Sequence, residues 1–235
     1  MRILALESSA LTASCAVCEE NLVVCESSIT AGLTHSQTLM VMVENMLKGS
    51  NQKLEDIDAI AVSVGPGSFT GLRIGVSSAK GMAKALSCPC IGVSTLYGLA
   101  RNLEGMEVIA CSVMDARRNQ VYNALFDMRM GKNLRICEDR AISVDELIEQ
   151  LKLMKYDVPV VLVGDGAELC YGKMKEVLDV KIAPPQLRLQ RAASVGFCGL
   201  EKLKKGGFSP ENEVVPKYLR LSQAERIRKE LGGKQ

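Results

Sequence analysis

The chain has 235 residues, an apolar fraction of 47% and a formal net charge of +2, which suits one large or two small globular domains. The low net charge and the 4% aromatic content argue against a broad nucleic-acid-binding surface. There is no signal-peptide pattern and no apolar run of membrane-spanning length, and the nine scattered cysteines suit reduced thiols, so we expect a cytoplasmic protein without membrane contact.

The first half of the chain predicts three strands followed by alternating helices and strands. Residues 2–7, 12–18 and 22–29 have the composition of strands joined by tight turns. The elements expected next, in order, are a helix at 36–48 capped by Thr34 or Ser36, a strand at 57–64, a helix at 72–86, a strand at 90–93 and a short helix from Ser94.

The second half repeats this order without a visible sequence repeat. The expected elements are strands at 108–114, 121–126 and 134–137, a helix at 143–153 with a capping box of Ser143 and Glu146, a strand at 160–163, and helices at 168–178 and 193–204. This order predicts two α/β lobes, each a mixed sheet flanked by helices. We expect residues 1–103 to form the first lobe with a returning C-terminal helix at about 190–221, residues 104–189 to form a smaller second lobe, and the charged tail 222–235 to fray.

A glycine-rich segment at residues 65–75 joins the strand at 57–64 to the following helix. Backbone N–H groups at such a helix start favour an anion or a closely approaching backbone. The segment is not a P-loop, because Gly71 is followed by Leu72 and Arg73 rather than by Lys and Ser or Thr. It also lacks the Gly-x-Ser-x-Gly spacing of a hydrolase elbow. The local sequence favours a tight turn over a ligand cradle, and both interpretations stay open.

The cysteines and the single histidine offer little catalytic chemistry. Cys15 and Cys18 have a spacing used by metal sites, but in a strand an offset of three places them on opposite faces, so core thiols are expected. His35 is the only histidine, and we expect it at a helix start or an interface rather than as a ligand.

Three turns follow strands at equivalent places in the two predicted lobes. Acidic, hydroxyl and glycine residues in such turns are the groups with which actin-like phosphotransferases hold a magnesium nucleotide. The candidate residues for a vestigial nucleotide cleft are Glu7, Ser8, Ser9, Asp115, Gly164 and Gly166. The alternative for Asp115 is a turn-stabilising pair with Arg117.

The chain resembles the TsaB (YeaZ) family, the companion subunit of the bacterial complex that attaches threonylcarbamoyl to adenosine in tRNA. The matching segments are residues 3–9, 34–37, 65–75, 91–96, 115–117, 121–122 and 216–225, which span nearly the whole chain in family order. The resemblance implies an actin-like (ASKHA) fold and a chain that does not perform the transfer. The metal-binding histidines and the transfer site are expected in a related subunit, TsaD.

The resemblance also sets expectations for cofactors and partners. It implies no cofactor for this chain alone, with magnesium-ATP open for the assembled complex, a TsaE-type ATPase partner, and tRNA contact mainly through TsaD. One departure is Glu7, where the family commonly has Asp; the longer carboxylate disfavours a working ATPase. An independent actin-like phosphotransferase or ATPase remains the alternative function, and a peptidase is a third, which a single histidine disfavours.

The helices at 36–48 and 72–86 carry more apolar residues than one docking face needs. We therefore expect surplus apolar surface there, a homodimer of the isolated chain, and competition by TsaD for the same helices. The expected partner interface comprises Leu39, Met42, Val43, Met46, Gly71, Leu72, Gly75, Val76, Ala79 and Met82. Burial of both helices within the lobe is the alternative.

Overall fold

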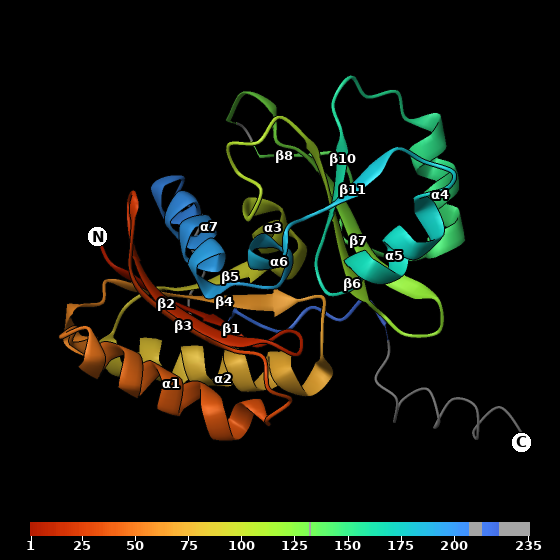
Figure 1. Ribbon diagram of the computed structural model, residues 1–235. Helices are drawn as coiled ribbons and strands as arrows, with labels where there is room; N and C mark the ends of the chain where they lie inside the picture. The colour runs from red at the N-terminus through yellow and green to blue at the C-terminus, as the bar shows by residue number, and fades with distance from the viewer. Residues whose placement is uncertain (132, 207–212, 221–235) are drawn as a thin grey trace, which may run out of the picture.

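The computed structural model describes residues 1–131, 133–206 and 213–220, and it contains two β-sheets with helices on their faces (Figure 1). The first sheet and its connections comprise β1 (Ile3–Glu7), β2 (Ala13–Glu19), β3 (Leu22–Ile29), α1 (His35–Gly49), η1 (Leu54–Asp56), β4 (Ala59–Gly65), α2 (Phe69–Leu86), β5 (Cys90–Ser94) and α3 (Thr95–Arg101). The remaining elements are β6 (Ile109–Asp115), β7 (Gln120–Asp127), η2 (Arg129–Gly131), β8 (Leu134–Arg135), β9 (Arg140–Ser143), α4 (Val144–Leu153), β10 (Val160–Val163), α5 (Ala167–Met174), β11 (Val180–Ile182), α6 (Pro185–Arg188) and α7 (Ala192–Lys204).

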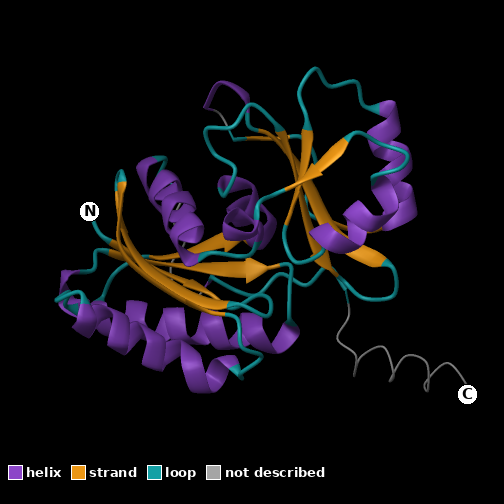
Figure 2. Cartoon of the chain, viewed as in Figure 1, coloured by secondary structure: helices purple, strands orange, loops and turns teal. Residues whose placement is uncertain are grey.

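The first sheet has the strand order β3-β2-β1-β4-β5. The β1–β2 and β2–β3 pairs are antiparallel, whereas β4 and β5 extend the sheet in parallel from β1. β1 and β4 are buried along their whole length, as expected for strands covered on both faces. Helices α1 and α2 lie along one face and α7 along the other (Figure 2).

The second sheet repeats this arrangement with the order β11-β10-β6-β7-β8, and β9 also pairs with β7. β6 is antiparallel to β7 and parallel to β10, as β1 is to β2 and β4. Helices α4 and α5 pack on one face of this sheet, and α3 packs on the other. The two sheets thus share one topology, and the predicted actin-like α/β fold class is confirmed.

Helix α3 lies between the two sheets and joins their cores. Leu96 and Leu99 of α3 are fully buried in a cluster with Met114 and Phe126 of the second sheet. The same helix also packs against β4 and β5 of the first sheet. This shared apolar layer holds the turns at the strand ends of both sheets in a fixed relation.

Most of the long elements agree with the sequence prediction. The capping box of Ser143 and Glu146 is present, and Cys15 and Cys18 lie in clusters on opposite faces of the first sheet. Helix α2 begins at Phe69, three residues earlier than expected, because Ser68 is its N-cap. The short elements β9, β11 and α6 were not predicted. The tail 222–235 lies outside the described residues.

Candidate functional site

The glycine-rich segment after β4 brings several stretches of backbone into contact. A Cβ on Gly65 would clash with the Lys217 carbonyl, and a Cβ on Gly67 would clash with that of Ser9, both at under 3.0 Å. The Ser68 N–H donates to the Ser9 carbonyl at 2.6 Å. These contacts support the tight-turn interpretation, because the glycines are needed for packing against the turn after β1 and against residues 213–220.

The turn after β1 keeps its carboxylate out of solvent. Glu7 is 1% exposed and accepts hydrogen bonds from the Ser9 N–H at 2.6 Å and from Ser63 Oγ. Loss of solvation on burial raises the pKa of Glu7. Ser8 is also buried, and its Oγ donates to the Gly71 carbonyl at 2.9 Å. Of this tripeptide, Ser9 lines the cleft described next, and Glu7 and Ser8 do not.

A cleft of about 580 Å³ separates the ends of the two sheets. The first lobe contributes Ser9 after β1, His35 at the start of α1 and Gly67 before α2, and the second lobe contributes Asp115 at the end of β6 and Asp165 after β10. The cleft does not include Glu7, Ser8, Gly164 or Gly166 among its lining residues. The structure therefore brings together Ser9 and Asp115 from the predicted cleft residues, but not the other four.

Asp165 is the cleft residue that the sequence argument missed, although it lies between two glycines that were singled out. Gly164 has a φ of +119°, and its N–H donates to the Arg188 carbonyl at 2.7 Å. The Gly166 N–H donates to the Val113 carbonyl at 3.1 Å. The glycines thus fix the turn against β6 and present the side chain between them. The Gln190 amide donates to Asp165 at 2.8 Å, and the surrounding cleft walls raise the pKa of Asp165 by reducing its solvation.

Asp115 forms the turn-stabilising pair that was the alternative to a metal ligand. Its carboxylate accepts from the Arg117 N–H at 2.7 Å and from the Arg117 guanidinium at 3.2 Å. The residues after it, Arg117, Arg118 and Asn119, all have positive φ values. This turn sits at the second-lobe edge of the cleft.

His35 joins the start of α1 to the turn after β1. Its Nε2 lies 2.7 Å from the Ala10 carbonyl, so this nitrogen carries the proton of the bond. No group of three His, Cys, Asp or Glu side chains that could hold a metal occurs within residues 1–131, 133–206 and 213–220. The position at a helix start agrees with the sequence expectation for this residue.

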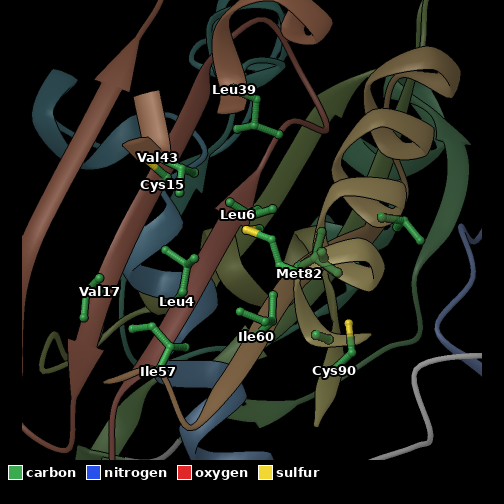
Figure 3. Close-up of a cluster of buried hydrophobic side chains, with 14 of the residues drawn as sticks. Leu4, Leu6, Cys15, Val17, Leu39, Val43, Ile57, Ile60, Met82 and Cys90 are labelled. Atoms are coloured by element: carbon green, nitrogen blue, oxygen red, sulfur yellow. The ribbon is translucent and has the colours of Figure 1, made fainter. Parts of the chain in front are cut away.

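The expectation of surplus apolar surface on α1 and α2 is wrong for the ten residues that were named as the partner interface. Leu39, Val43 and Met82 point into one cluster with Leu4 and Ile60 of the first sheet (Figure 3). All ten expected interface residues are buried, namely Leu39, Met42, Val43, Met46, Gly71, Leu72, Gly75, Val76, Ala79 and Met82. The sheet face is wide enough to cover both apolar stripes, because two helices share it.

The small residues of α2 have a packing role inside the lobe. A Cβ on Gly71 would clash with the Ser8 carbonyl, and a Cβ on Gly75 would clash with Ser8 Oγ, both at under 3.0 Å. These glycines let α2 approach the turn after β1, rather than letting a helix of another chain approach α2. The exposed apolar side chains of α1 are instead Met40 and Val41, at 43% and 53% exposure.

Residues 213–220 form a segment that crosses from one lobe to the other. Val214 is buried in the core under the first sheet, and the Lys217 N–H donates to the Val64 carbonyl at 2.6 Å. Tyr218 stacks on Phe69 at the start of α2. Arg220 donates to the Ala116 carbonyl in the turn of the second sheet. We call these residues the C-terminal strap. The returning helix expected at about 190–221 is wrong for this part, because α7 ends at Lys204 and residues 214–220 are not helical.

Comparison with known proteins gives consistent matches. The family model of TsaD, tRNA N6-adenosine threonylcarbamoyltransferase, matches residues 29–227. The tRNA threonylcarbamoyladenosine biosynthesis protein TsaB of Bacillus subtilis is 33% identical over 227 residues, 96% of either chain. TsaB of Escherichia coli is 33% identical over 170 residues, 71% of this chain and 72% of the relative. The structure of YeaZ from Pseudomonas aeruginosa superposes with a TM-score of 0.78 at 25% identity, covering 93% of this chain and 99% of that one.

Proposed function

The chain belongs to the TsaB family of tRNA threonylcarbamoyladenosine biosynthesis proteins, and from that premise we propose that it is a non-catalytic subunit that docks the TsaD transferase. The family assigns the chain to this tRNA modification pathway. The proposal adds that the chemistry takes place in the partner. The main support for a non-catalytic chain is the hydrogen bonding of Glu7. Both of its carboxylate oxygens accept hydrogen bonds inside the first lobe.

A magnesium nucleotide does not fit the cleft through the residues that were expected to hold it. Glu7 would have to break two buried hydrogen bonds to reach the cleft, and Asp115 is bound to Arg117. This supports a chain that needs no cofactor of its own, and it disfavours the alternative of an independent actin-like ATPase. Any magnesium-ATP in the assembled complex would then be held by other subunits, such as the TsaE-type ATPase.

A peptidase function is disfavoured because four cysteine thiols that could act as nucleophiles are buried. Burial raises the pKa of Cys15, Cys18 and Cys170 to about 12, and it raises that of Cys111 well above its usual range. The thiolate needed for attack is therefore scarce at neutral pH. The Nε2 of His35 is engaged with the Ala10 carbonyl rather than with a hydroxyl or thiol.

We place the docking surface on the side of α1 and α2 that faces away from the first sheet. This outer face is made of Met40, Val41, Glu44, Arg73, Ser77, Gly81 and Lys84, all of which are exposed. It combines two exposed apolar side chains of α1, Met40 and Val41, with the small residues Ser77 and Gly81 of α2, which would let a partner helix come close. A stable interface there should bury more than about 1,000 Å² in total.

The same face is proposed to serve a homodimer of the isolated chain, which TsaD would then displace. The complex is expected to work in the cytoplasm and to contact tRNA mainly through TsaD. No helix in the described ranges is both long and apolar enough to cross a bilayer.

Reconstitution tests the proposed function. Modification of tRNA is measured with TsaD, TsaE and the activated threonylcarbamoyl donor, with and without this chain, and with Glu7→Gln in its place. We expect modification to require the chain and to be unaffected by Glu7→Gln. Full activity without the chain, or loss of activity with Glu7→Gln in a folded protein, would contradict the proposal.

A further inference from the structure

A second pocket lies between the two lobes. Its volume is about 610 Å³, and none of its described lining residues lines the cleft or belongs to the proposed docking face. Its walls come from β5, the start of α3, β8, the C-terminal end of α7 and the C-terminal strap. The proposed function makes no use of this pocket.

A half-buried ammonium group in this pocket has no anionic partner. Lys202 of α7 donates to the Gly92 carbonyl at 2.6 Å, and it forms no ion pair with a carboxylate of the described residues. The pKa of Lys202 is lowered, first by burial and then by the charge of Lys217, which lines the same pocket. The charge of Arg135 acts in the same direction. Cations that are removed from water are normally paired, so this group of cations favours a bound anion.

The carboxylates beside these cations are already bound to other partners. Asp139 accepts from Ser94 Oγ and from Arg135, both at 2.6 Å. Glu201 accepts from three donors, namely Tyr97, Arg101 and Lys205. These bonds hold both carboxylates away from Lys202 and leave its charge uncompensated.

The rest of the lining indicates the kind of anion. Val64 and Ile91 give the pocket a buried apolar wall, and Val215, at 54% exposure, extends this wall toward solvent. An apolar wall beside a cationic end suits a ligand with an anionic head and an aliphatic body. Two further carboxylates, Glu138 and Glu213, are exposed in the lining and repel a dianionic head more strongly than a monoanionic one.

We propose that this pocket binds an aliphatic monocarboxylate. The carboxylate would accept from the ammonium groups of Lys202 and Lys217, and the aliphatic chain would lie against Val64, Ile91 and Val215. A bound ligand would contact both lobes and the strap, because all three line the pocket. The site is independent of the docking proposal, since its residues lie outside the outer face of α1 and α2.

Calorimetry on the full chain at constant ionic strength tests the ligand class. Hexanoate should bind at least about tenfold more tightly than acetate, because the single methyl group of acetate covers little of the apolar wall. Pentylphosphonate has the same tail as hexanoate and a head that carries a second negative charge, so it should bind more weakly. Hexylamine has the tail with a cationic head and should not bind.

Variants of the full chain test the residues. Lys202→Met keeps the length and the apolar stem of the side chain, and it should weaken hexanoate binding at least about tenfold, the loss expected for a bond to a charged group. Lys204→Met is the matched control, because Lys204 lies two residues further along α7 and outside the pocket lining, and it should change nothing. Val215→Ala should weaken the binding of hexanoate but not that of acetate.

Methyl NMR of the unaltered chain keeps the test independent of how the variants fold. Hexanoate at millimolar concentration should shift the methyl signals of Val64 and Val215. The proposal is overturned if those signals do not move, if pentylphosphonate or hexylamine binds as tightly as hexanoate, or if Lys202→Met binds hexanoate as the original chain does. Neither TsaD binding nor tRNA modification enters these readouts, so failure here leaves the docking proposal untouched.

Discussion

The ring of Tyr218 stacks on that of Phe69, with the centroids 4.6 Å apart and the planes inclined by 29°. The Tyr218 hydroxyl accepts from Arg73 Nε at 3.1 Å, and the Arg73 guanidinium lies 3.9 Å from the Phe69 centroid. These three side chains attach the C-terminal strap to the first turn of α2. The strap therefore links the proposed docking helix to the second lobe, which it reaches through Arg220.

Replacing Tyr218 tests whether this attachment contributes to stability. Tyr218→Ala should lower the free energy of unfolding by about 1–2 kcal/mol, because it removes the aromatic pair and its apolar contact. Tyr218→Phe keeps the stacked ring and should lose less than about 1 kcal/mol. Urea unfolding gives both values. Equal losses for the two variants would mean that the ring contact is not what holds the strap.

Two glycines of α2 form a matched pair for testing the role of small residues. Gly75→Ala should destabilise the chain by about 1–3 kcal/mol, because its Cβ would overlap with Ser8 Oγ and push the helix away from β1. Gly81→Ala lies on the same helix with nothing within 4 Å of the added Cβ, and it should stabilise the chain by up to about 1 kcal/mol. Urea unfolding measures both changes, and a stabilising Gly75→Ala would refute the packing role.

The buried Glu7 carboxyl predicts a specific pH dependence. Its pKa is raised in the folded chain, mainly by burial, so the folded state binds this proton more tightly than the unfolded state. The contribution of Glu7 to stability therefore falls as the pH rises from about 4.3, the ordinary pKa of glutamate, through the raised value.

Glu7→Gln replaces the carboxyl with an amide that does not titrate, so it isolates the effect of the Glu7 proton on stability. The amide can still accept from the Ser9 N–H and donate to Ser63 Oγ, so the fold should persist. The stability of the variant relative to the original chain should increase with pH over that interval and then level off. Urea unfolding of both proteins is measured from about pH 4 to about pH 8. A stability difference that stayed constant or decreased with pH would contradict the raised pKa of Glu7.

The sequence was informative where strong local patterns decide structure. The strands of both sheets have apolar runs bounded by turn residues, and Ser143 with Glu146 is a self-contained capping signal. The elements β9 and β11 were missed because they have only four and three residues, too few to show a strand pattern. The strap was missed because its position depends on contacts with Val64 and Phe69.

The site was less predictable than the fold. Nothing local distinguishes Glu7, which turns inward to Ser63, from Asp165, which faces the cleft. The apolar residues of α1 and α2 could be counted from sequence, but their burial depends on how two helices share one sheet face. Val76 is an example: it was expected at the interface, but it is 4% exposed, and a charge there would disrupt the core.

The most direct test of the docking account is the affinity of the full chain for TsaD, measured by biolayer interferometry for outer-face and control variants. Val41→Arg on α1 and Ser77→Arg on α2 are compared with Leu153→Arg on α4, since all three sites are exposed and should leave folding intact. The account predicts that both outer-face variants bind TsaD at least about a hundredfold more weakly, while Leu153→Arg binds as the original chain does. Unchanged affinity of both outer-face variants, with folding verified, would contradict it.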